Sequence, residues 1–140
     1  MTTPLSIRFE PALLARLRRR ARAVGNSSTS ALAQRLIDEG LRMADHPGVI
    51  FKDGPAGRRA ALGYGPDIWE VVKFLREIDE RGPAALDAAA DVFAVDTSRI
   101  ATALSYYASY RDEIDAEITD ADEASVRAEE AWRTQRRLIS

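Results

Sequence analysis

The fold that we expect for this chain is decided by residues 4–43, PLSIRFEPALLARLRRRARAVGNSSTSALAQRLIDEGLRM. Every second side chain in residues 4–9 is apolar, which predicts a short β-strand with one apolar and one polar face. Such a strand has no partner within its own unit, and unpaired backbone amides are costly. We therefore expect it to pair with the same strand of a second copy across a two-fold axis. The apolar face carries Leu5, Ile7 and Phe9, and the polar face carries Ser6 and Arg8.

Two amphipathic helices follow the strand, over residues 11–24 and 29–43. In each, apolar side chains recur at the three- and four-residue spacing that places them on one helix face. Between the helices, residues 25–28 predict a turn, with Gly25 suited to end the first helix and the serines suited to cap the second. The second helix has more apolar residues than a single copy can cover, which again predicts a dimer.

This segment resembles the ribbon-helix-helix family of transcriptional repressors, because it has a strand, a basic helix, a polar turn and an amphipathic helix in this order. The resemblance implies a dimer whose two-stranded ribbon enters the major groove of operator DNA. Ser6 and Arg8 would then contact base edges. Pro4 departs from the polar residue that often stands there in the family, so we expect two contacts per strand.

The same resemblance predicts phosphate contacts near the turn between the two helices. The amino-terminal amides of the second helix attract anions, and arginines of the first helix attract the DNA backbone. Taken alone, the arginines could equally form a solvated face, and the serines could equally act only as helix caps. The expected phosphate contacts are Arg18, Arg22, Ser27, Ser28 and Thr29.

Charge is divided unevenly along the chain. Residues 1–43 contain eight arginines and three acidic residues, a net charge of +5, whereas residues 44–140 contain twelve basic and nineteen acidic residues, a net charge of −7. A basic first part and an acidic second part indicate a DNA-binding module joined to a module of another kind. The overall charge of −2 would by itself argue against nucleic acid.

The pattern changes near residue 45, where Asp-His-Pro-Gly predicts a boundary. Residues 49–51 and 58–62 predict a β-hairpin. A third helix is expected from Asp67 to the Arg-Gly-Pro at 81–83, and a fourth over residues 84–93. A long fifth helix is expected to begin at residue 97, with one apolar side that continues to Ile118. The expected fold class is thus mainly α: a dimeric ribbon-helix-helix (residues 1–44), a winged-helix-like domain (46–118) and a helical tail (119–140).

Four segments of the second part resemble motifs of a family of small helix-turn-helix-like domains. Members of this family occur as antitoxins beside PIN-like ribonuclease toxins, so the resemblance implies a VapBC-type toxin–antitoxin pair. It covers residues 46–118. The segments are His46-Pro-Gly-Val-Ile-Phe51, Asp53-Gly-Pro-Ala-Gly-Arg-Arg59, Trp69-Glu-Val71 and Ile100-Ala-Thr-Ala-Leu-Ser-Tyr-Tyr107.

The resemblance also implies a role for the tail, residues 119–140. PIN-type nucleases hold Mg²⁺ with a cluster of carboxylates, and arginines of an antitoxin can pair with those carboxylates. A tryptophan would supply the buried anchor that an interface needs. The tail has too few apolar residues to pack firmly on its own, so the sequence leaves open whether this helical segment is ordered or frayed without a partner. The expected toxin-binding residues are Trp132, Arg133, Arg136 and Arg137.

Acidic residues argue against two other kinds of site. They flank the predicted helix-turn-helix of the second part, which would oppose a second DNA contact there. The acidic run from Asp112 to Glu123 is more typical of a solvated helix than of a Mg²⁺ site, because its carboxylates fall on several helix faces. We therefore expect this domain to serve as a scaffold and protein interface.

Composition narrows the class of function further. The chain has no cysteine, and its single histidine, His46, lies beside Pro-Gly with no catalytic partner in view, so we expect neither an enzyme nor a cofactor. No apolar run approaches membrane-spanning length and the amino terminus lacks a signal-peptide pattern, so we expect a cytoplasmic protein. The leading interpretation is a DNA-binding antitoxin. The alternative is a stand-alone repressor whose second domain serves oligomerisation or ligand sensing.

Overall fold

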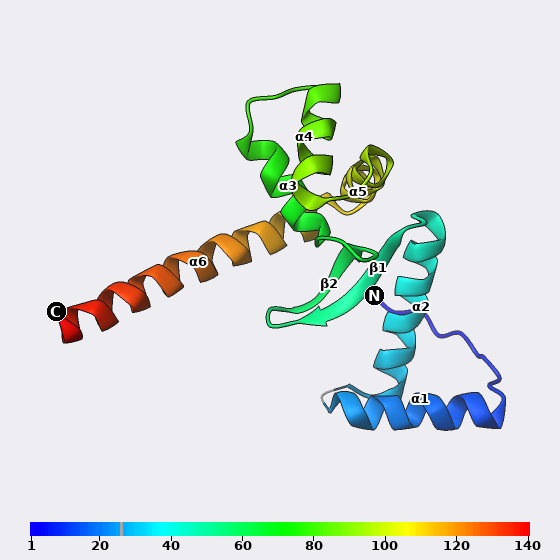
Figure 1. The fold of residues 1–140 in the computed structure, drawn as a ribbon. Coiled ribbons are helices and arrows are strands. Elements are labelled where there is room, and N and C mark those ends of the chain that lie inside the picture. Colours follow the sequence, from blue (N-terminus) through cyan, green and yellow to red (C-terminus); the bar gives the residue numbers. More distant parts are fainter. Residues whose placement is uncertain (26) are drawn as a thin grey trace. The chain divides into compact units, whose positions relative to one another are not determined.

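The structure is a computed structural model that describes residues 1–25 and 27–140. Asn26, in the predicted turn, lies outside the described residues. Within them the fold is mainly α, with six helices and one two-stranded antiparallel hairpin (Figure 1). The chain divides into two compact units, Met1–Ala44 and Asp45–Ser140, and each is described by itself below.

The first unit contains α1 (Pro11–Val24) and α2 (Thr29–Asp45), which confirms the two predicted helices. Pro11 stands in the first turn, where its missing N–H would have no helical partner in any case. Helix α1 ends at Gly25, whose φ of 86° is costly for residues with a Cβ atom. The Ser28 hydroxyl accepts a hydrogen bond of 3.0 Å from the Ala31 N–H and so caps α2.

Residues 1–10 precede α1 and form neither helix nor strand in the single chain. The predicted strand over residues 4–9 requires pairing with a second copy, and one chain cannot provide it. The two-stranded ribbon therefore stays a prediction. Among the described residues of this unit, the buried apolar side chains are Ala21 and Leu32.

The second unit begins with a hairpin of β1 (Val49–Gly54) and β2 (Gly57–Leu62). Its register runs from Val49 opposite Leu62 to Gly54 opposite Gly57, which leaves a two-residue turn. The hairpin was predicted, but its strands extend closer to the turn than expected. The polar pairs near the turn fit an exposed antiparallel ladder, as the 3.4 Å ion pair between Arg58 and Asp53 illustrates.

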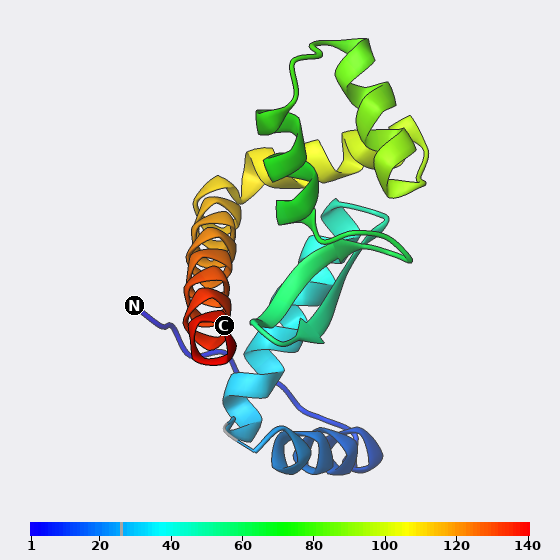
Figure 2. The ribbon, with the colours of Figure 1, turned by 60° about the vertical axis from the view of Figure 1, so that its left-hand side comes forward.

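Four helices complete this unit: α3 (Ile68–Glu77), α4 (Pro83–Phe93), α5 (Thr97–Ser109) and α6 (Arg111–Ile139). The inner faces of α3, α5, β2 and the first turns of α6 form a common core, which also receives the partly buried rings of Trp69 and Phe74. Figure 2 shows the hairpin at one end of the group formed by α3, α4 and α5. The largest fully buried side chains of this core are Tyr106, Leu62, Ile68, Ile100, Ile114 and Val71.

The prediction of one long fifth helix was wrong. The helix breaks at Tyr110, whose φ of −131° and ψ of 42° lie outside the helical region, and α6 begins at the next residue. Ile100, Ile114 and Ile118 are all buried, but they belong to two helices that cover the same core. Because the apolar spacing continues across the break and no Gly or Pro marks it, periodicity alone did not reveal two helices.

Helix α6 continues to Ile139, which confirms the predicted helical tail. Its first part is packed in the core through Ile114 and Ile118, whereas residues 122–140 are exposed. Figure 1 shows this outer half extending beyond the other elements of its unit. In the part of the chain that the structure describes, every helix is too short or too polar to cross a membrane.

Candidate nucleic-acid and protein interfaces

The five residues predicted to contact DNA phosphates line a single hollow between α1 and α2. Arg18 and Arg22 lie one helical turn apart on α1, and Ser27, Ser28 and Thr29 lead into α2. The hollow has a volume of about 360 Å³. Two guanidinium groups beside the positive end of a helix dipole make a site suited to an anion the size of a phosphate.

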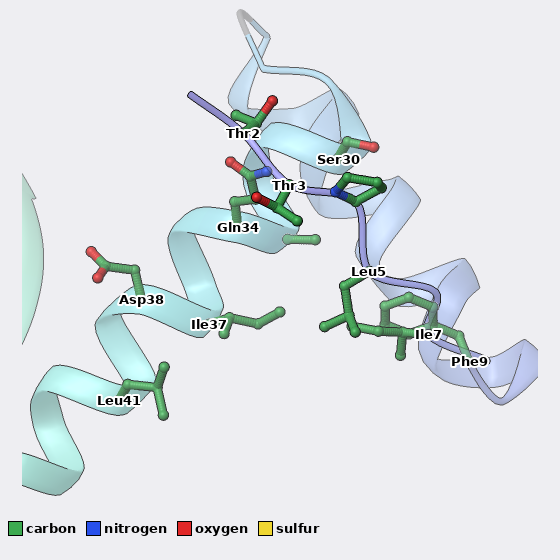
Figure 3. A pocket seen from close by; sticks show the side chains of 12 residues that line it. Thr2, Thr3, Leu5, Ile7, Phe9, Ser30, Gln34, Ile37, Asp38 and Leu41 are labelled. Atoms are coloured by element: carbon green, nitrogen blue, oxygen red, sulfur yellow. The ribbon is translucent and has the colours of Figure 1, made fainter.

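The two predicted base-reading residues, Ser6 and Arg8, are exposed on the segment before α1. Their apolar neighbours Leu5, Ile7 and Phe9 line a groove of about 710 Å³ along α2. Figure 3 shows Leu5 and Ile37 directed toward one another across this groove. Ser6 and Arg8 do not line this groove.

Apolar side chains of the first unit are more exposed than a stable isolated unit would leave them. In the single chain the exposed fractions are 82% for Leu5, 48% for Ile37 and 62% for Leu41. A unit of this length buries too little surface to be stable alone, and a contiguous apolar face on it indicates an interface. Ile7 lines the same groove as these three residues, whereas the exposed Leu13 and Leu36 line a second hollow together with arginines of α1.

Helices α4 and α5 have helix-turn-helix proportions, but the first turn of α5 is poorly suited to phosphate. Arg99, its only cation, donates a hydrogen bond to the backbone carbonyl of Gly63. Thr97 and Ser98 are exposed beside the carboxylate of Asp96. With its cation engaged and an acidic residue at its start, this helix end is poorly placed to attract DNA.

The interpretation of the acidic run as a solvated helix was wrong for its inner face. Four of its carboxylates contact basic side chains that come from β2 and α3, so they fix α6 to the rest of the unit. No acidic or histidine cluster suited to a metal ion occurs in residues 1–25 and 27–140. The ion pairs are Arg59 with Glu117 (3.2 Å) and Asp120 (4.0 Å), Lys73 with Asp122, and Arg76 with Asp115.

Two of these carboxyl groups have pKa values that move in opposite directions. The Tyr107 hydroxyl donates a 2.8 Å hydrogen bond to Asp115, and together with Arg76 it lowers the pKa of that carboxyl. Burial raises the pKa of Glu117, and the attraction of Arg59 only partly opposes this effect. Burial of the ionised Glu117 side chain therefore lowers the stability of the folded state, and the attraction of Arg59 reduces this loss.

Replacing Arg59 by Met is expected to lower the free energy of unfolding by about 3 kcal/mol at pH 7, because Glu117 then stays buried without its counter-ion. The variant Arg59→Met with Glu117→Met should recover most of that loss. Since protonation of Glu117 favours the folded state, the loss in the single variant should shrink as the pH falls toward the ordinary pKa of a glutamate. Urea unfolding at pH 7 and pH 4.5 measures both effects.

Arg58→Met provides the matched control for this prediction. Its partner Asp53 is largely exposed, so its loss should cost less than about 1 kcal/mol. Equal losses for Arg58→Met and Arg59→Met would contradict a special role for the buried pair. A loss in Arg59→Met that grows on acidification would contradict the sign of the Glu117 effect.

The predicted toxin-binding residues all lie on the exposed outer half of α6. The ring of Trp132 is 54% exposed, and the Arg136 guanidinium lies 4.8 Å from its centroid. Arg133 forms an ion pair with Glu129 one turn earlier, and Arg137 is exposed on the next turn after Arg133. An aromatic ring and three cations on two adjacent turns form a surface that an acidic partner could cover.

Two structural features of the second unit were not predicted from the sequence. His46, predicted to be a loop residue, has its ring edge-on to Tyr106 at a centroid distance of 5.3 Å, which gives it a structural role. Tyr64 is fully exposed and has a φ of 53°, which is uncommon for a residue with a side chain. Nothing in its Gly-Tyr-Gly-Pro context predicted an exposed ring.

No protein-family model, curated protein or solved structure matches this chain. The two family resemblances drawn from the sequence therefore stay predictions, and the functional argument depends on the surfaces described above.

Proposed function

We propose that this chain is the antitoxin of a type II toxin–antitoxin module. Its first unit would bind operator DNA as a dimer, and the outer half of α6 would inhibit a PIN-like ribonuclease. The observation that carries the proposal is the presence of two exposed surfaces of different chemistry on one chain. One is basic and apolar, on residues 1–44, and the other is an Arg/Trp surface on α6.

The DNA-binding part of the proposal is supported by the bounds of α1 and α2 and by the hollow lined by Arg18 and Arg22. In a ribbon formed by two copies, Ser6 and Arg8 would project together on the face opposite Leu5 and the other groove-lining residues. Arginine reads guanine through two hydrogen bonds in the major groove. Four such side chains per dimer give limited specificity, so we expect two dimers on adjacent sites.

Replacing Arg8 by Ala and Arg18 by Ala should have different effects on operator binding. Arg8→Ala should relax sequence preference and cost about 1–3 kcal/mol per base contact. Arg18→Ala should weaken binding to all sequences and reduce the salt dependence of binding. Titrations with operator and scrambled DNA at several salt concentrations measure both quantities.

Glu10→Ala offers a control, because it removes a charge from the same exposed region without removing a predicted DNA contact. It should leave specificity unchanged. The predicted ribbon readout would be contradicted if Arg8→Ala lost affinity equally for operator and scrambled DNA.

The toxin-binding part of the proposal is supported by the exposure of Trp132 and by the three arginines around it. Arginine side chains can pair with the carboxylates that hold Mg²⁺ in a PIN-like nuclease and so replace the metal electrostatically. The ion pairs at residues 115–122 fix the start of α6 to its unit and leave its outer half exposed.

The alternative, a stand-alone repressor, would use the same DNA-binding surface but no toxin. Co-expression with the protein encoded next to this chain separates the two functions. An antitoxin should co-purify with that protein and suppress its ribonuclease activity, whereas a stand-alone repressor should purify without it.

A further inference from the structure

Helix α6 carries a largely apolar stripe with a repeat of 3.5 residues. It begins at the buried Ile114 and Ile118 and continues at alternating intervals of three and four residues to the end of the helix. A 3.5-residue repeat is the spacing of a left-handed coiled coil, not of a lone straight helix. Its members, of which only the serine and the glutamine are polar, are Ile114, Ile118, Ala121, Ser125, Ala128, Trp132, Gln135 and Ile139.

Only the start of this stripe is covered within the second unit. From residue 122 onward every residue is exposed, with Ile139 at 85% and Trp132 at 54%. Figure 1 shows this segment extending beyond the other elements of its unit. A projecting helix of this length gains little stability by itself and draws most of it from packing of its apolar face.

We propose that this stripe pairs in an antiparallel coiled coil with the same stripe of a second copy of the chain. The size of the side chains supports this alignment. In the antiparallel arrangement Trp132 lies against the partner's Ala128, and Ile139 lies against the partner's Ala121. Each large side chain then fills the space above a small one, whereas a parallel arrangement would place two Trp132 rings side by side.

The other pairs of the same alignment are also matched in chemistry. Gln135, the larger polar member of the stripe, lies against the partner's Ser125, so their amide and hydroxyl groups can form a hydrogen bond inside the interface. At one edge of the stripe, the exposed Leu138 lies against the partner's Ala124. A single alignment of the two helices therefore places large side chains against small ones, and polar side chains against polar ones, along the whole outer half of α6.

Charge at the opposite edge of the stripe supports the same arrangement. Antiparallel pairing places Arg136 opposite the partner's Asp122, a carboxylate that also forms an ion pair with Lys73 of its own unit, and the two-fold axis repeats this contact. The axis passes near Ala131, which would face the partner's Ala131 and allow close approach of the two helices. Glu129 also lies near the axis, and its ion pair with Arg133 on the same helix offsets its charge there. Parallel pairing would place only alanine or leucine opposite Arg136.

The pairing has a consequence for the proposed function, although it requires neither toxin nor DNA. Trp132 and Arg136 would lie within the paired helices, and the same residues belong to the surface proposed to bind the toxin. Self-pairing of α6 and toxin binding would therefore exclude one another. The free antitoxin would hold Trp132 and Arg136 of this surface covered until a toxin displaces the second copy.

Cysteine crosslinking of the full chain tests this pairing, because the native sequence contains no cysteine. Ala131→Cys should be crosslinked to a second copy by a short bismaleimide. Ala124→Cys makes the same change on the same edge one heptad earlier, and antiparallel pairing separates it from the partner's residue 124 by roughly 20 Å along the helix axis. It should not be crosslinked. Equal crosslinking at both positions, or none at either, would overturn the proposal.

Charge reversal gives a second test in the Ala131→Cys background. Arg136→Glu should reduce crosslinking about tenfold, since it places like charges opposite one another at two positions. Mixing that chain with one that carries Asp122→Arg should restore crosslinking between the two. Arg137→Glu makes the same charge change on the outer face and should have no effect. An equal response to Arg136→Glu and Arg137→Glu would overturn the antiparallel alignment.

Discussion

Replacing Ile37 by Asp is expected to make the first unit monomeric and to abolish operator binding. Ile37 lines the groove along α2 with Leu5 and Leu41, and the proposed dimer would bury this face. A carboxylate introduced there would be buried without a partner, which costs several kcal/mol. We expect operator affinity to fall by at least about a hundredfold, because the ribbon requires both copies.

This experiment is best done on a chain that ends at residue 124, so that pairing of α6 does not contribute to the measured mass. Sedimentation equilibrium gives the oligomeric state, and gel retardation gives the affinity. Ala15→Asp adds the same charge to an exposed position of α1 away from the groove and should leave both unchanged. A dimeric Ile37→Asp variant that still binds operator would contradict the proposed interface.

The second large effect is expected from the loss of Trp132. Changing Trp132 to Ala removes the aromatic anchor of the Arg/Trp surface, and truncation of such a residue at an interface centre costs about 2 kcal/mol or more. Inhibition of the toxin should weaken by about thirtyfold or more. Operator binding should not change, because residues 1–44 are untouched. Titration of the ribonuclease with the variant antitoxin measures the loss.

Arg127→Ala is the matched control, since it shortens another exposed side chain of α6 that lies away from Trp132. It should inhibit the toxin as well as the native chain does. If both variants lose inhibition equally, a general weakening of the helix explains the effect better than an anchor at Trp132.

Local sequence patterns predicted most of the helices and the hairpin because their boundaries are marked by strong signals. Pro11, Gly25, Ser28 and Pro83 each act through backbone geometry or a local hydrogen bond, and α1 and α4 begin within one residue of the expected positions. The break at Tyr110 carries no such signal. It depends on how α5 and α6 cover one core, which is a tertiary effect.

The candidate sites show the same difference between local signals, which the sequence reveals, and tertiary contacts, which it does not. The residues that line the hollow near the start of α2 are close in sequence, so their grouping could be predicted. The ion pairs of Arg59 and Arg76 with α6 join residues far apart in the chain, and charge patterning within α6 alone could not reveal them. The helical state of the tail was predicted, but the apolar stripe that its outer half continues from the core was not recognised from the sequence.

The most direct measurement is co-purification of the tagged full-length chain with the protein encoded beside it, followed by a ribonuclease assay of the complex. The proposed function predicts a stable complex without ribonuclease activity, and predicts that a chain lacking residues 125–140 releases an active ribonuclease while still binding operator DNA. Failure of the two proteins to associate, or equal association and inhibition by the shortened chain, would contradict it.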